Sequence, residues 1–200
     1  MKYELRKKAL YLEYATVGYN VLEGFFSIFA GVLAGSIALV GFGLDSAIES
    51  ASGCVLIWRL TRKGLDESGE ERVERKAARL VAWSFFALGG YVLFESARKL
   101  YFMEAPEPSL LGIVIAALSI ITMPALAYLK HATAVKMNSR ALAADSKETL
   151  VCALLSVALL IGLGLNYLYG LWWADPAAAL VIVVFIFWEG YEMFEESRGQ

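Results

Sequence analysis

Six long runs of mainly apolar residues dominate the chain, and short polar segments separate them. The runs cover residues 10–33, 36–60, 77–102, 110–129, 140–165 and 176–194. A helix needs about 20 mainly apolar residues to cross a hydrocarbon core of about 30 Å, and each run has that length or close to it. Because a backbone in lipid must satisfy its own hydrogen bonds, all six runs are predicted to be transmembrane helices.

Composition agrees with an all-α membrane protein. The 200 residues are 58% hydrophobic, and the mean hydropathy is +0.57. Six spans with short connections use nearly the whole chain, so we expect 1–200 to form a single six-helix transmembrane domain with no C-terminal cytoplasmic domain. The charged start is not read as a cleaved signal peptide, because the first apolar run passes Leu33 without a cleavage-type segment. The net charge of −2 gives no basis for nucleic-acid binding.

Basic residues predict the orientation. All but three of the 18 Lys and Arg residues precede the first run, flank the polar segments after the second and fourth runs, or follow the sixth. Lys130 is counted among them, at the edge of the segment after the fourth run. Lys and Arg are enriched on the cytoplasmic side, so both termini are predicted to be cytoplasmic. The mixed-charge segment 61–76 is expected to be a short solvated helix or a flexible loop.

Ionisable residues within two apolar runs are the strongest functional signal, because charge in a bilayer is costly and usually faces a cavity or a partner. Asp45 and Glu49 are four residues apart in the second run, and Glu148 and Cys152 are four apart in the fifth. Each pair therefore shares one face of its helix. At about 1.5 Å per residue, the four side chains lie between about 12 and 21 Å from the cytoplasmic edge, on helices that run in opposite directions.

Three carboxylates and a thiol at one depth repel one another unless a cation or protons lie between them. A divalent cation removes that repulsion. Oxygen and thiolate ligands suit tetrahedral Zn²⁺, whereas Mg²⁺ and Ca²⁺ prefer oxygen alone. We therefore expect a metal site at Asp45, Glu49, Glu148 and Cys152, with Zn²⁺ as the first candidate and Fe²⁺, Mn²⁺ or Co²⁺ as others. A structural interpretation stays open for Cys152, since cysteine is also a common small core residue.

Three further residues are secondary site candidates. Asn20 and Glu23 lie three apart in the first run, and they either line the same cavity or bond to neighbouring helices. Asp145 either joins the site or forms an ion pair near the cytoplasmic end, with Arg140 and Lys147.

The other ionisable groups near the spans have ordinary interpretations. Glu13, seven residues before Asn20, has the same two alternatives as Asn20 and Glu23, a place at the cavity or a bond to a neighbouring helix. Glu189 and Glu192 are expected to be solvated. The only histidine, His131, lies at the edge of a polar segment and is read as a surface residue. A nucleophilic cysteine needs an activating base. No histidine lies inside a predicted span, so an enzyme built on Cys152 is not expected.

Short motifs in three of the runs carry a resemblance to a known family. They are Gly35-Ser-Ile-Ala-Leu leading to Asp45-Ser-Ala-Ile-Glu49, Arg140-Ala-Leu-Ala-Ala-Asp145 leading to Glu148 and Cys152, and Trp173-Ala-Asp175-Pro176. With these motifs and its six-span layout, the chain resembles the cation diffusion facilitator family of metal-ion efflux transporters. By matching position, Asp45 and Glu49 correspond to the ligand pair of the second span. Glu148 stands where the family usually has His, and Cys152 where it usually has Asp.

The resemblance implies a homodimer in the cell membrane that alternates between inward and outward states. It would export a divalent cation in exchange for protons and would not be an enzyme. Family members usually carry a cytoplasmic metal-binding domain after the sixth span, so the chain is similar to a short branch with the transmembrane region only. The alternative is a membrane metal-binding or regulatory subunit that does not transport alone.

Overall fold

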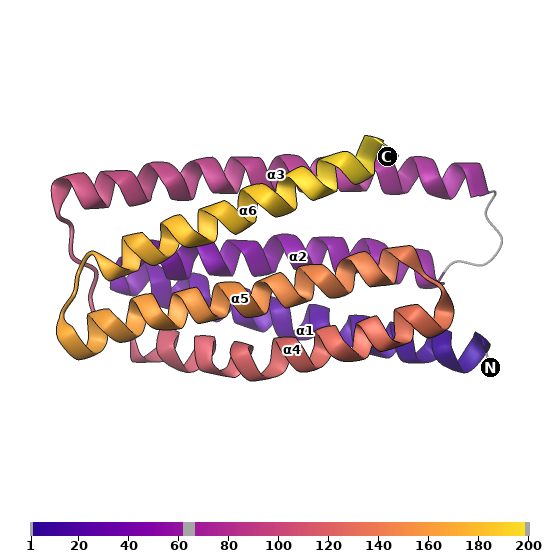
Figure 1. The fold of residues 1–200 in the computed structure, drawn as a ribbon, viewed down its shortest axis with the longest axis horizontal. Coiled ribbons are helices and arrows are strands. Elements are labelled where there is room, and N and C mark those ends of the chain that lie inside the picture. Colours follow the sequence, from indigo (N-terminus) through magenta and orange to yellow (C-terminus); the bar gives the residue numbers. More distant parts are fainter. Residues whose placement is uncertain (1, 62–66, 199–200) are drawn as a thin grey trace.

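A computed structural model describes residues 2–61 and 67–198 and shows six helices in this part of the chain (Figure 1). They are α1 (Lys2–Ala34), α2 (Ile37–Thr61), α3 (Glu67–Phe102), α4 (Leu110–Met137), α5 (Arg140–Tyr169) and α6 (Ala174–Arg198). All six are long and apolar enough to cross a membrane. The prediction of an all-α protein with six spans is confirmed.

Several helices are longer than the apolar runs that predicted them. α1 begins at Lys2, α4 continues to Met137, and α3 begins at Glu67 within the mixed-charge segment. Hydropathy locates the part of a helix that crosses the hydrocarbon, whereas hydrogen bonding continues a helix through polar turns beyond it. The expectation for residues 62–66 lies outside the described residues.

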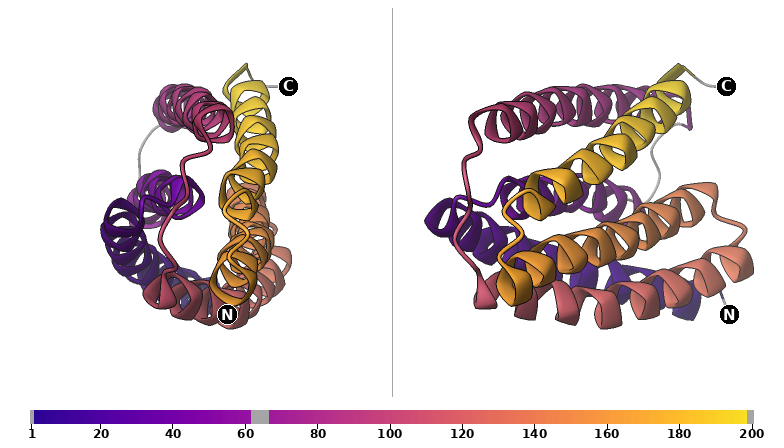
Figure 2. Two further views of the ribbon diagram at one scale, coloured as in Figure 1. Left: turned by 90° about the vertical axis from the view of Figure 1, so that its left-hand side faces the viewer. Right: turned by 60° about the vertical axis from the view of Figure 1, so that its left-hand side comes forward.

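Both termini lie at the same end of the helix bundle, which we call the terminus end (Figure 1). The short connections after α1, α3 and α5 lie at the opposite end. α1 packs mainly on α2, α3 on α6, and α4 on α5, while α5 also contacts α6 and α2. Figure 2 shows α3 and α6 side by side along one edge of the bundle. Because α2, α5 and α6 contact one another, their inward faces meet inside the bundle.

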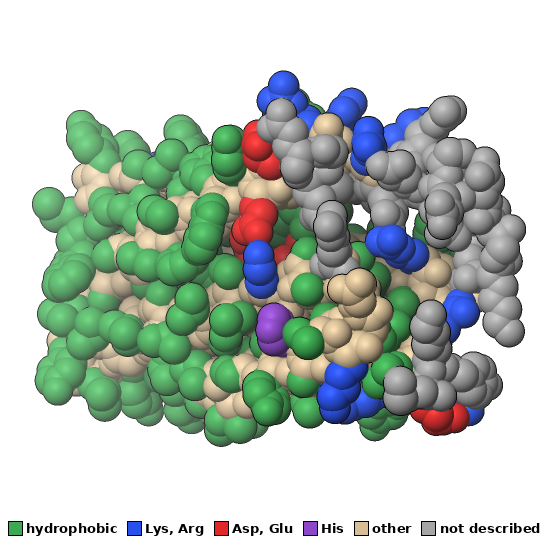
Figure 3. Space-filling view, turned by 45° about the vertical axis from the view of Figure 1, so that its right-hand side comes forward, with side chains coloured by type: hydrophobic (Ala, Val, Ile, Leu, Met, Phe, Trp, Pro, Cys, Tyr) green, Lys and Arg blue, Asp and Glu red, His purple; other side chains and the backbone are tan. Residues whose placement is uncertain are grey.

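The surface has the character expected of a lipid-facing protein. Large apolar side chains are exposed on α1, α3, α4, α5 and α6, including Phe25, Trp83, Ile121 and Val184. On the face drawn in Figure 3, hydrophobic side chains cover most of the surface, and Lys and Arg side chains gather toward the terminus end. Lipid contact explains why so much apolar area remains outside the core.

Glycines bring α1 and α2 into close contact. A Cβ atom on Gly24 would lie 2.9 Å from the carbonyl oxygen of Gly43, and one on Gly31 would lie 2.8 Å from the backbone nitrogen of Val40. Small residues at helix interfaces in membranes permit such an approach. It places Glu23, next to Gly24 on α1, against α2.

An aspartate of α6 caps the start of α2. Asp175 accepts hydrogen bonds from the Ile37 backbone N–H at 3.0 Å and from the Ser36 hydroxyl. The first N–H groups of a helix have no partner within the helix, and a carboxylate there also interacts favourably with the helix dipole. Asp175 of the Trp173–Pro176 motif therefore fixes the first turn of α6 against the first turn of α2.

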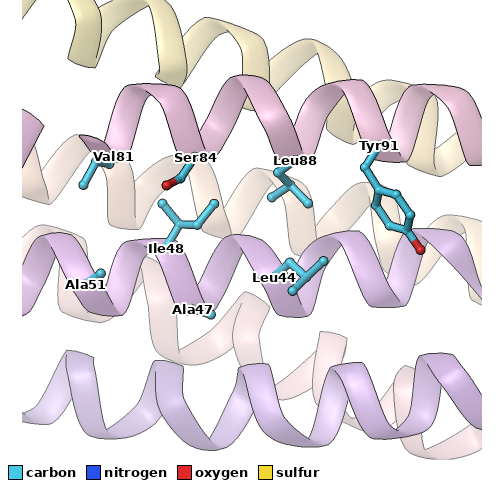
Figure 4. Close-up of a pocket in the computed structure, with 8 residues that line it drawn as sticks. All are labelled: Leu44, Ala47, Ile48, Ala51, Val81, Ser84, Leu88 and Tyr91. Atoms are coloured by element: carbon cyan, nitrogen blue, oxygen red, sulfur yellow. The ribbon is translucent and has the colours of Figure 1, made fainter. Parts of the chain in front are cut away.

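An apolar groove lies between α2 and α3, with side chains of both helices facing each other across it (Figure 4). Its volume is about 370 Å³, and its lining includes Leu44 and Ile48 of α2 and Leu88 of α3. Among the described residues, no carboxylate, thiol or imidazole lines it, and its polar groups are the hydroxyls of Ser84 and Tyr91. The groove therefore offers a cation no charged ligand, and the site has to be sought among the buried polar groups.

Candidate functional site

The four principal candidate residues lie inside the bundle. Asp45 and Glu49 of α2 are 2% and 5% exposed, and Glu148 and Cys152 of α5 are 9% and 1% exposed. Each pair occupies one face of its helix because its members are four residues apart. The two helices cross the bundle in opposite directions and contact each other. The sequence therefore places all four side chains toward the interior.

The two pairs are close enough to interact electrostatically. The Cys152 thiol interacts with the carboxylates of Asp45 and Glu49, and the Glu148 carboxylate interacts with that of Glu49. Asp45 and Glu49 also interact with each other. The structure thus brings the pairs of α2 and α5 into one acidic region.

A third helix contributes Glu23 to this region. The Ser46 hydroxyl of α2 donates a hydrogen bond to Glu23 Oε2 at 3.0 Å, and Cys152 Sγ lies 3.9 Å from the same oxygen. Glu23 therefore joins α1 to both α2 and α5. Asn20, one turn earlier on α1, is fully buried, and its amide has no hydrogen-bond partner among the described residues.

Many carboxylate oxygens in this region lack a hydrogen-bond donor. Within the described part of the chain, the oxygens without a partner include both of Glu49, both of Glu148, and one each of Asp45 and Glu23. Buried polar groups are nearly always hydrogen-bonded, and an unpaired buried charge is strongly destabilising. This region is therefore suited to bind cations or protons, which would supply the missing positive charge.

The potential metal ligands lie in one region but do not surround a common position for a metal ion. No group of three or more His, Cys, Asp and Glu side chains among the described residues is arranged so that it could hold a metal ion. The structure therefore shows converging donors, and a coordination sphere would require these side chains to move toward one another.

A second group of charged residues surrounds Lys130 and adjoins the first, since Lys130 and Asp145 also interact electrostatically with Glu49 and Glu148. The Lys130 ammonium donates hydrogen bonds to Asp145 and, at 3.2 Å, to Thr149 of α5. It also lies 3.3 Å from Glu13 of α1, and Lys130 and Glu13 are almost completely buried. Asp145 thus has a cationic partner from α4.

This cluster corrects two expectations. Lys130 was expected at the edge of a polar segment, but α4 continues to Met137 and the residue lies inside a span. Of the two alternatives for Glu13, the structure shows a contact with a neighbouring helix, through Lys130 of α4. The expected partner Lys147 lies instead 3.7 Å from Glu192, at the surface. Because Glu13 and Asp145 pair with Lys130, this charged residue can lie inside the bundle. Its position in the sequence therefore did not indicate where α4 ends.

Glu189 was expected to be solvated, and this expectation is wrong. Its side chain is buried, and its carboxylate interacts electrostatically with those of Asp45, Glu49 and Glu148. Glu189 follows the fully buried Ile182 and Ile186 at helical spacing, so it shares their inward face. That spacing was the signal in the sequence that could have identified it. Glu192 and His131 are exposed, as predicted.

Comparison with known proteins indicates a transport role for the chain. Residues 14–199 match the family of the cation efflux transmembrane domain. An uncharacterized transporter from Synechocystis is 23% identical over 173 residues, which are 84% of this chain and 56% of that protein.

Two relatives have more specific names. The manganese efflux system protein MneS of Bacillus subtilis is 27% identical over 199 residues, covering 97% of this chain and 68% of MneS. The cation-efflux pump FieF of Shewanella oneidensis is 30% identical over 127 residues, covering 62% of this chain and 42% of FieF. Except for MneS, these matches span only about half the length of the relative.

Proposed function

The chain belongs to the cation efflux transmembrane domain family, and from this premise we propose that it exports a divalent transition-metal cation. The family match makes it a multi-pass membrane protein of a transporter class. The cation, the coupling ion and the residues that bind the cation are our proposal.

One observation supports the choice of residues that bind the transported cation. Two helices contribute the pairs Asp45/Glu49 and Glu148/Cys152, and their buried oxygens largely lack hydrogen-bond donors. We propose these four side chains as the ligands of the transported cation, with Glu23 as a neighbouring oxygen donor. Because charge is costly in a membrane interior, such residues usually mark the path of a substrate ion.

Zn²⁺ is the first candidate for the cation. The thiol of Cys152 together with carboxylates matches the ligand types of tetrahedral zinc. Mn²⁺ is the second, because carboxylate oxygens predominate and suit manganese, and because MneS, which is similar along 97% of this chain, is named as a manganese efflux protein. Fe²⁺ and Co²⁺ complete the proposed range.

Protons are the proposed coupling ion. Ligands must lose their protons to bind a metal, so cation binding releases protons and weakens as the pH falls. A site open to the cytoplasm would load the cation, and exposure to an acidic exterior would favour its release. The basic residues near the terminus end support the proposal that both termini are cytoplasmic. On the basis of the family resemblance, we also propose that the protein is a homodimer in the cell membrane.

The test is flux into liposomes that contain the purified protein and a zinc-sensitive dye, with and without an acidic interior. We expect saturable Zn²⁺ or Mn²⁺ uptake that increases with the pH gradient, and competition between the two ions gives the preference. Cation binding by calorimetry with no flux under any gradient would instead favour a metal-binding or regulatory subunit. Absence of both would contradict the proposal.

A further inference from the structure

A small cavity lies between α5 and α6, toward the terminus end from Cys152. Its volume is about 30 Å³, and its polar lining consists of Lys147, Glu148, Glu189 and Glu192. That is room for at least one water-sized sphere. A single bare metal ion is smaller, so the cavity can hold one between these side chains.

Glu148 turns this cavity into a candidate ligand site. Its side chain is more than nine-tenths buried and lines the cavity. Neither of its carboxylate oxygens has a hydrogen-bond partner among the described residues. An acidic side chain that lines a cavity without a donor points to a cationic occupant.

A buried carboxylate of α6 interacts both with a surface carboxylate and with the proposed transport site. Glu192 is 54% exposed, while Glu189, one turn earlier on α6, is buried. Glu189 interacts electrostatically with Glu192 and also with Glu49 and Asp45. Glu189 is therefore within electrostatic reach of both the exposed carboxylate and the pair of α2, and it lines the cavity.

An ion pair lies at the mouth of the cavity. Lys147 Nζ is 3.7 Å from Glu192 Oε1, and the two side chains are 69% and 54% exposed. Exposed ion pairs contribute little to stability and separate easily. The Lys147 charge also repels an approaching cation, so breaking this pair would free Glu192 and remove a nearby positive charge.

We propose that this α5–α6 cavity is a transfer site for the divalent cation, in which Glu189 and Glu148 bind it between the solution at the terminus end and Asp45, Glu49 and Cys152. The Lys147–Glu192 pair closes its mouth. The inference rests on the proposed function and adds Glu189 as a ligand that no motif of the resemblance includes.

The test compares the KM for Zn²⁺ and Mn²⁺ in liposomes for three variants. Glu189→Gln preserves the shape of the side chain but removes a charged group that would bind the metal. It should raise the KM about tenfold and should change the kcat by no more than about twofold. Lys147→Gln should lower the KM about threefold, since it removes the repelling charge. Glu195→Gln removes the same charge from α6 outside the cavity lining and should leave the KM unchanged.

Equilibrium Mn²⁺ binding, followed by electron paramagnetic resonance in lipid nanodiscs, gives a second measurement. Weaker binding to Glu189→Gln than to Glu195→Gln would support the transfer site. An unchanged KM in both Glu189→Gln and Lys147→Gln, with normal flux, would overturn this inference and leave the proposed function standing. If Glu189→Gln does not fold, Lys147→Gln alone decides by the same criterion. Absence of flux and binding in the unaltered protein would overturn both.

Discussion

Replacing Lys130 by methionine should destabilise the protein strongly. The Lys130 side chain is 1% exposed, and its ammonium group contacts Asp145, Glu13 and Thr149. Methionine keeps most of the side-chain volume but leaves two buried carboxylates without their cation. Removing one partner of a buried ion pair typically costs about 3–5 kcal/mol.

That loss can be converted to a change in melting temperature. For a chain of this length, each kcal/mol corresponds to about 2–4 °C. Lys130→Met should therefore lower the Tm by about 6–20 °C, measured by thermal unfolding in lipid nanodiscs. The matched control is Lys147→Met, because Lys147 and Glu192 form an exposed pair. Such a pair contributes about 0–1 kcal/mol, so the control should shift the Tm by no more than about 4 °C.

Restoring charge balance separates the role of the ion pair from the loss of packing. The triple variant Lys130→Met, Glu13→Gln, Asp145→Asn carries no buried charge in this cluster. It should recover most of the lost stability, because replacing a whole buried ion pair by uncharged groups often changes the stability little. The reasoning is refuted if Lys130→Met and Lys147→Met have the same Tm. It is also refuted if the triple variant is less stable than Lys130→Met.

Three other predictions concern separate contacts. Asp175→Ala removes the acceptor for Ile37 N–H and should cost about 1–3 kcal/mol by thermal unfolding; an unchanged Tm would show that this cap is not needed. Gly24→Ala should destabilise the protein by about 1–3 kcal/mol, because the new Cβ would meet the Gly43 carbonyl oxygen. The control Gly18→Ala has open space around it and should leave the stability unchanged. Equal effects of the two variants would contradict the close approach of α1 and α2. Cys152→Ser should shift selectivity from Zn²⁺ toward Mn²⁺ by about tenfold in competitive flux, and an unaltered ratio would make Cys152 a structural residue.

The sequence predicted the spans because crossing a membrane is a local property. A run of about 20 mainly apolar residues suffices, whatever its neighbours are. The ends of α1 and α4 were placed incorrectly because helical hydrogen bonding continues into polar turns, where hydropathy gives no signal. Lys130 made this error worse, because its charge resembled the end of a span.

The candidate site could be predicted only where its geometry lies within one helix. The four-residue spacing of Asp45 and Glu49 fixes a shared face without knowledge of the fold. The partners of Lys130 come from α1 and α5, so they depend on which helices are neighbours. The burial of Glu189 likewise depends on how α6 packs beside α5.

Zinc and manganese flux in Asp45→Asn tests the central claim most directly. Asparagine preserves the size of the side chain and removes its charge, in a region where Glu49, Glu23 and Cys152 are close enough to interact with it. We predict normal folding, judged by Tm, with flux reduced at least about a hundredfold, while Glu195→Gln transports normally. Asp45→Asn protein that moves either cation at the rate of the unaltered protein would contradict the assignment of the transport site.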